Sequence, residues 1–180
     1  MYVVTQAYYT AYQNYIQDST NTIIEPSRPT TTELSAYYPQ INDYKMLSDS
    51  AILNSVVFKP LFGPKAASAL RGTIKVIKNS NTNASDSEIR SAVLTQMNNY
   101  FNINNWNFGD TFYFSELSAY IHAEIGELVS SCVLVPNDPT MSFGDLYEIK
   151  CLPYEIFVNA ATANDVLVIA ALTPAELQIA

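Results

Sequence analysis

The stretch GTIKVIKNSNTNASDSEIRSAVLTQMNNY, residues 72–100, decides the fold. Its first seven residues alternate between apolar and polar side chains, which is the period of a strand that buries one face. Ser85 and Glu88 then form a capping box, in which the serine hydroxyl accepts the Glu88 amide and the carboxylate reaches back. The helix that follows has an inner face made of Ile89, Ala92, Val93, Gln96, Met97 and Tyr100.

Further strands and a second helix are predicted on both sides of this unit. Apolar and β-branched residues predict a strand at 51–58, which Pro60 and the Gly63-Pro64 pair should end. Ser115 should cap the second helix and Gly126 should end it. The inner face of this helix should consist of Leu117, Ile121 and Ile125.

Strands and turns are predicted for the rest of the chain, from residue 128 onward. Residues 128–135, LVSSCVLV, are apolar on both faces and predict a central strand. Shorter strands are expected at 146–152, 155–158 and 165–170, with a turn at 136–139 and a last helical turn from Thr173. The predicted fold class is α+β, an antiparallel or mixed sheet with two main helices on one face, and the domain should span residues 45–180.

Residues 1–44 are expected to be a helical arm and a linker. Eight of the thirteen tyrosines lie there, and apolar residues at helical spacing predict a helix over 2–17. Three prolines between residues 18 and 43 predict a proline-rich linker. Because tyrosine is favoured at interfaces, Tyr2, Tyr9 and Tyr12 are candidate interface residues, although the helix could equally fold back onto the domain.

Composition and charge exclude several classes of protein. The net charge is −8 and the pI about 4.4, whereas a protein that binds duplex nucleic acid needs a basic surface. The longest apolar run, residues 166–172, is far shorter than the roughly 20 residues of a membrane helix. Charged residues make up only 14%, against roughly 25% in typical soluble domains, which suits a subunit packed against neighbours.

Positive charge is concentrated in one part of the chain. Residues 50–85 contain five bases and no acid, while residues 91–180 contain ten acids and a single base. The stretch could be a solvated basic face or a patch that docks on an acidic neighbour, including a second copy of the chain. Lys59, Lys75 and Lys78 are therefore candidate interface residues.

The sequence offers little for catalysis or cofactor binding. His122 is the only histidine, and it is expected mid-helix without an orienting partner. Cys132 and Cys151 are expected to be reduced, buried and inert, and their spacing matches no zinc site. We therefore expect no catalytic, cofactor-binding or metal-binding residues and predict a structural protein.

Four segments from about Ser48 onward resemble a known family in their order and spacing. They are SVVFKPLFGPKAASALRGTIKVI (55–77), SDSEIRSAVLTQMNNYF (85–101), NINNWNFGDTFYFSELSAYIHAEIGELVSSCVLVP (102–136) and GDLYEIKCLPYEIFVNAATANDVLVIAAL (144–172). Together they resemble the C-terminal part of the baseplate wedge proteins of contractile-tail bacteriophages, the baseplate J-like family. Members of that family are usually much longer.

The resemblance implies a non-enzymatic virion subunit, made in the bacterial host cytoplasm and located in the tail baseplate. Its partners would be itself and other baseplate wedge proteins, and its contacts would join neighbouring wedges into a ring around the hub. Neither nucleic acid nor membrane is an expected partner. The alternatives are another virion structural protein, such as a tail connector or terminator, and a small cell-wall hydrolase.

Overall fold

The computed structural model describes residues 1–37, 52–138 and 148–170, and in these parts the chain is an α+β protein, as the sequence predicts. The helices are α1 (Gln6–Gln17), α2 (Thr31–Tyr37), α4 (Asp86–Tyr100) and α5 (Phe114–Ile125). The strands are β1 (Tyr2–Val3), β2 (Asn54–Ser55), β3 (Val57–Leu61), β4 (Gly72–Lys78), β5 (Thr111–Tyr113), β6 (Val129–Pro136), β7 (Glu148–Lys150), β8 (Glu155–Asn159) and β9 (Val166–Ile169). Short 3-10 turns lie at Ser68–Leu70, Ile103–Asn105 and Ala163–Asp165.

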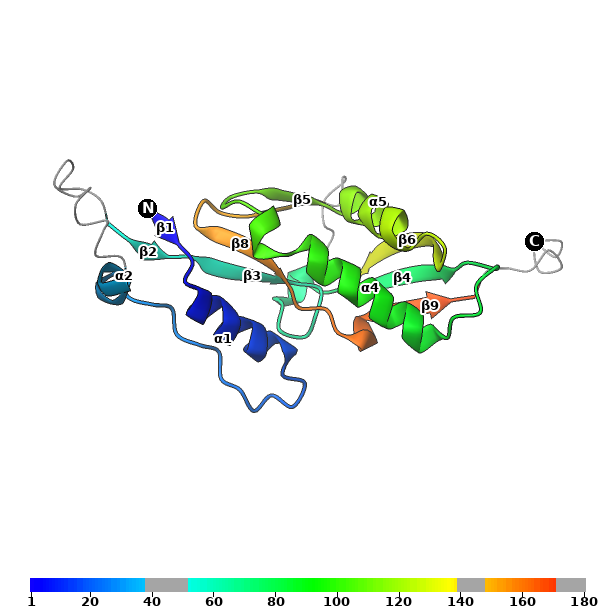
Figure 1. Ribbon diagram of the computed structural model, residues 1–180, viewed down its shortest axis with the longest axis horizontal. Coiled ribbons are helices and arrows are strands. Elements are labelled where there is room, and N and C mark those ends of the chain that lie inside the picture. Colours follow the sequence, from blue (N-terminus) through cyan, green and yellow to red (C-terminus); the bar gives the residue numbers. More distant parts are fainter. Residues whose placement is uncertain (38–51, 139–147, 171–180) are drawn as a thin grey trace.

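The described strands form small sheets instead of one continuous sheet. Three are pairs, β1–β2, β3–β8 and β5–β7, and the fourth is β6–β4–β9. In that three-stranded sheet β4 runs antiparallel to β6 and parallel to β9. Figure 1 shows these sheets along the long axis of the molecule, with α1 and α2 towards one end and α4 and α5 towards the other.

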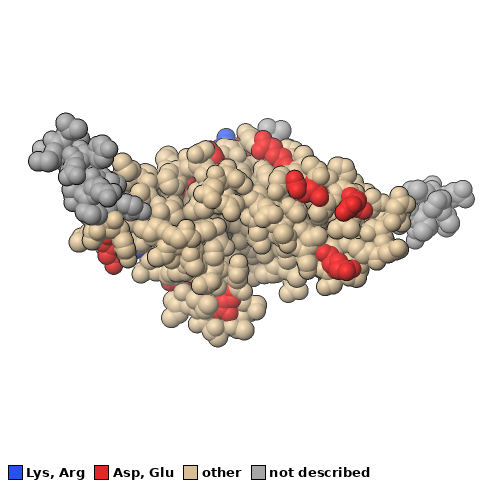
Figure 2. All heavy atoms as spheres, viewed as in Figure 1, with Lys and Arg blue, Asp and Glu red and all other residues tan. Residues whose placement is uncertain are grey.

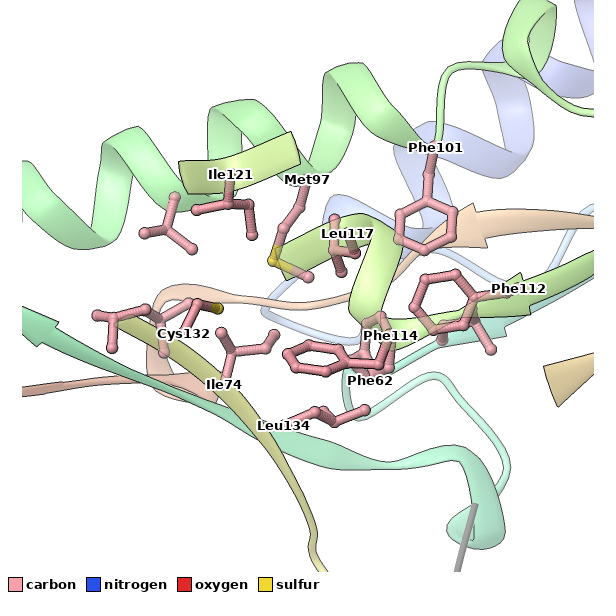
Figure 3. Packing of buried hydrophobic residues seen from close by; sticks show 14 of the residues in the cluster. Phe62, Ile74, Met97, Phe101, Phe112, Phe114, Leu117, Ile121, Cys132 and Leu134 are labelled. Carbon is pink, nitrogen blue, oxygen red and sulfur yellow. The ribbon is translucent and has the colours of Figure 1, made fainter. Parts of the chain in front are cut away.

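The main core lies between the β6–β4–β9 sheet and the two long helices. Figure 3 shows Met97 of α4 and Ile121 of α5 on the helix side of this core, with Ile74 of β4 and Leu134 of β6 on the sheet side. The capping box that starts α4 is confirmed, since the Glu88 amide donates to Ser85 Oγ at 3.3 Å and the Ser85 amide to Glu88 Oε2 at 2.6 Å. Its predicted inner face is confirmed at the three fully buried positions, Ile89, Val93 and Met97.

A second core lies between α1 and the β3–β8 pair. Tyr8, Tyr12 and Ile16, at i, i+4 and i+8, pack on a strand face that includes Phe58 and Ile156. The opposite face of the same pair, with Leu61 and Phe157, belongs to the main core. Both faces of β3–β8 therefore contribute to a core, which is why most of its residues are apolar.

The N-terminal segment differs from the prediction in two ways. The helix begins at Gln6, because Tyr2–Val3 pair with Asn54–Ser55 as a short parallel ladder. The segment predicted as linker contains α2, which begins after Thr30: the Glu33 carboxylate accepts the Thr30 amide at 2.7 Å. Residues 38–51 lie outside the described parts, so the division of the chain at residue 44 stays a prediction.

The strand predicted over 51–58 is shifted towards the C-terminus. It begins at Asn54 and, after Val56, continues through Pro60 to Leu61. Pro60 does not end the strand. The Val57 amide donates to the Tyr154 carbonyl at 2.9 Å, so the backbone N–H groups of Val57 and of every second residue after it point towards β8. Pro60 faces the other edge, where the described residues place no strand, and no N–H is needed there.

Two further predictions were wrong. Helix α5 begins at Phe114 directly after β5, so Ser115 lies in its first turn; the capping residue is Tyr113, which makes no side-chain cap. Among the described strands, β6 lies at an edge of its sheet and β4 is central. The ends of α5 at Gly126 and of the strands β8 and β9 agree with prediction within one residue. The predicted helical turn from Thr173 and part of the turn at 136–139 lie outside the described residues.

Candidate interface on the open sheet face

One face of the β6–β4–β9 sheet carries no helix in the described parts of the chain. Strand alternation points Ile74 and Val76 of β4 into the core and turns the residues between them outward. The outward residues form what we call the open face: Thr73, Lys75, Ile77, Ser131, Val133, Val135, Leu167 and Ile169. In Figure 1, α4 crosses in front of this sheet, and the open face is on the far side.

The open face is unusually apolar for a surface. The exposed fractions are 51% for Val133, 42% for Leu167, 41% for Ile169 and 37% for Ile77. Cross-strand pairing brings these residues together, because Ile77 lies opposite Ile169. Clustered exposed aliphatic side chains of this kind mark surfaces that bind another protein, whereas scattered ones do not.

Lys75 lies at the centre of the open face. It is opposite Val133 on β6 and opposite Leu167 on β9, so aliphatic side chains flank it on both sides. The ion pairs of the described residues, Lys59–Glu155 and Lys150–Glu148, do not include it. Its ammonium group is therefore available to a carboxylate of a partner.

The other two predicted lysines have roles within the chain. Lys59 Nζ lies 3.0 Å from Glu155 Oε2 and donates to the Lys150 carbonyl at 2.8 Å, which ties β3 to β8 and to the end of β7. Lys78 Nζ donates to the Ala84 carbonyl and closes the connection between β4 and α4. The structure thus separates Lys59 from the open face, and only Lys75 has no partner in the described parts.

The predicted tyrosines are placed differently from one another. Tyr12 is wrongly assigned to the interface: it is only 4% exposed, and its ring centroid lies 4.6 Å from that of Phe58. Tyr9 is half-buried beside the same phenylalanine, at 5.9 Å. Tyr2 is exposed and lies 6.0 Å from the Tyr154 ring. The helix folds back onto its own domain because its apolar stripe passes through Tyr8 and Tyr12, one residue away from the predicted Tyr9.

The aliphatic residues of the open face were missed by the sequence reasoning. The signal was present in LVSSCVLV, where both faces of the strand are apolar. We interpreted this as a central strand, but it also describes an edge strand whose outward face binds a partner. The alternation in GTIKVIK carries the same signal, because Ile77 breaks the polar side of the pattern.

Groups that could carry chemistry are dispersed or inaccessible. Cys132 and Cys151 are free thiols and buried, as predicted, and burial raises the pKa of each to about 12, which keeps them protonated. His122 is exposed in the last turn of α5. Within the described residues, no three side chains of His, Cys, Asp or Glu are grouped as metal ligands, and no helix is long and apolar enough to cross a membrane.

Comparison of the chain with models of known protein families finds no match, and a search of curated protein sequences finds no match either.

Proposed function

We propose that the chain is a structural subunit of a contractile-tail baseplate wedge. In this proposal it joins neighbouring wedges into a ring around the hub, through contacts with copies of itself and with other wedge proteins. The subunit belongs to the virion and is assembled in the host cytoplasm. The open face is the surface at which one of these contacts forms.

The observation that carries the proposal is the group of four exposed aliphatic side chains on one sheet face. An α+β domain with two helices on one face of a mixed sheet normally needs a second layer on the other face if that face is apolar. Here the second layer would come from another subunit. Low charge density supports this, because with 14% charged residues few ionised groups have to lose their hydration when a contact forms.

The resemblance to the baseplate J-like family is the second support. Of the segments that carry the resemblance, residues 85–101 contain α4, and the valine-rich end of residues 102–136 is β6. The first segment, residues 55–77, ends in β4 and contains Lys75 and Ile77 of the open face. The segments that carry the resemblance therefore include the strands that carry the proposed contact.

Locating the protein in virions tests the proposal. Antibodies raised against the full chain would be bound to purified phage particles, and gold-labelled antibodies imaged by electron microscopy. We expect the label at the tail end distal to the head. Label at the head-proximal end would favour a connector or terminator, and absence of the protein from purified virions would contradict a structural role.

A further inference from the structure

A pocket of about 410 Å³ opens where the end of α4, strand β5 and the first turns of α5 meet. Three aromatic side chains line it, Tyr100, Trp106 and Tyr120, together with two carboxylates, Asp110 and Glu116. The pocket is separate from the open face, since none of its lining residues belongs to β4, β6 or β9.

The aromatic rings form angled walls. The Tyr100 ring centroid lies 5.6 Å from that of Trp106, with 72° between the planes, and 5.4 Å from that of Tyr120, with 52° between the planes. Trp106 Nε1 donates to the Tyr100 carbonyl at 2.9 Å, which fixes the indole relative to the end of α4. The indole is therefore held in place at the end of α4 before any ligand arrives.

Each carboxylate keeps one oxygen free for a ligand. Glu116 Oε2 lies 3.5 Å from the Tyr100 hydroxyl, and Asp110 Oδ2 accepts the Asn107 amide at 2.7 Å. Glu116 Oε1 and Asp110 Oδ1 have no hydrogen-bond partner in the described parts of the chain. Lys150, opposite Thr111 in the β5–β7 ladder, is engaged with Glu148 at 3.4 Å.

This combination of groups selects a cation. The faces of aromatic rings attract positive charge. The two carboxylates, which take part in no ion pair of the described residues, repel anions. The surface around the site is also acidic. In Figure 2, acidic side chains are spread over the face that carries α4 and α5, and scarcely any basic side chain is visible there. Burial and Glu116 raise the pKa of the Tyr100 hydroxyl to about 12, so it stays neutral and does not itself add charge.

Among biological cations, a guanidinium group fits these walls best. It is planar, so it can lie against a ring, and its five N–H donors can reach two carboxylate oxygens at once. An ammonium group is more strongly hydrated and has no flat face. We propose that this pocket binds the side chain of an arginine residue in another polypeptide chain. The inference does not depend on the proposed role in a baseplate.

Nuclear magnetic resonance tests the proposal directly, because Trp106 is the only tryptophan and gives a single indole N–H signal. The full chain would be titrated with acetyl-arginine-amide up to about 50 mM, a range suited to the millimolar affinity expected of one side chain. We expect a saturating shift of the indole signal. Acetyl-citrulline-amide, which has the same shape without the charge, should bind roughly tenfold more weakly.

Two further ligands define the source and type of the cation. Acetyl-lysine-amide should bind more weakly than the arginine compound. Acetyl-arginine, which has a free α-carboxylate and no α-ammonium group, should also bind more weakly, because Asp110 and Glu116 repel its carboxylate. Equal binding of arginine and citrulline compounds would overturn the proposal, and so would the absence of any saturating shift. Acetyl-arginine that binds as tightly as the doubly capped form would overturn the assignment to a residue within a chain.

Matched variants locate the binding. Glu116→Gln keeps the size of an exposed side chain and should weaken binding several-fold, and Tyr120→Leu should do the same by removing a ring. Glu124→Gln is the control, because Glu124 is exposed on the same helix and lies outside the pocket. Thermal melting checks that each variant is folded. Binding that is unchanged in Glu116→Gln, or weakened equally in Glu124→Gln, would place the cation elsewhere.

Discussion

Replacing Val133 and Leu167 by threonine should weaken association of the chain without unfolding it. Both side chains lie on the open face, on either side of Lys75, and roughly half of each is exposed. Threonine is β-branched and suits a strand, so the sheet should be retained. The exposed half of each side chain is the part that only a partner can bury.

The expected magnitude follows from the carbon atoms removed. The two substitutions remove three apolar carbons per open face, and at about 0.8 kcal/mol per buried carbon, half of which remains for association, they cost about 1.2 kcal/mol. This corresponds to an association constant about eightfold lower for each open face in the contact. The other half of each side chain is already buried within the chain, so the free energy of unfolding should fall by a similar amount, about 1.2 kcal/mol.

Sedimentation equilibrium of the full chain measures the association constant, and circular dichroism measures the melting temperature. Val166→Thr is the matched control, because Val166 lies on the same strand as Leu167 but is only 2% exposed. Its hydroxyl would lie in the main core, so unfolding should become easier by about 2 kcal/mol. Our reasoning fails if the double variant lowers the melting temperature as much as Val166→Thr does, or if its association constant is unchanged.

Two other predictions concern stability. Tyr12→Ala should lower the free energy of unfolding by about 3 kcal/mol, because Tyr12 is buried against Phe58. Urea denaturation measures this change, and a value below about 1 kcal/mol would mean that α1 is not part of the core in solution. Hydrogen bonds from Ser85 lower the pKa of Glu88 in the folded state, so the stability that this capping box adds is present above the unfolded value of 4.5 and is lost as the pH falls through the lower, folded value. Glu88→Gln removes the titrating carboxyl group and should remove this part of the pH dependence, and melting curves with the same acid profile in both proteins would contradict it.

The sequence predicted the elements whose local signals and burial agree. Strand β4 and helix α4 are correct because alternation, the capping box and the apolar face all indicate the same structure. The buried face of α5 is also correct, although its start is not. Strand β5 runs directly into α5, so the capping position falls on the last strand residue, Tyr113, whose side chain makes no cap. Ser115 matched the pattern without occupying that position.

The remaining errors arise because a residue pattern within one element does not show which other elements pack beside it. Two apolar faces on residues 128–135 do not distinguish a strand with neighbours on both sides from an edge strand with a partner-binding face. Tyrosines spaced along α1 are compatible with stripes through Tyr8 or Tyr9, and only packing against Phe58 decides between them. Prolines at 26 and 29 predicted a linker. Residues 18–30 contain no helix or strand, but the prolines did not exclude α2 directly after them.

The central position of Lys75 makes the open face selective for one kind of partner. Burying an ammonium group among aliphatic side chains is unfavourable unless a carboxylate meets it. A symmetric pair of open faces would bring two Lys75 side chains towards each other, whereas an acidic surface, such as the one seen over α4 and α5 in Figure 2, would neutralise the charge. We therefore expect each open face to contact an acidic surface of the next subunit.

Lys75→Met distinguishes the two arrangements, because methionine keeps most of the aliphatic length of lysine and removes the charge. Against an acidic surface, the variant should associate more slowly than the original chain at low salt, and its association rate should no longer fall as salt is added. In a symmetric pair it should instead associate more tightly than the original chain, most clearly at low salt, since a like-charge repulsion is removed. Stopped-flow light scattering across a salt series measures both, and faster or tighter association of Lys75→Met would contradict docking on an acidic neighbour.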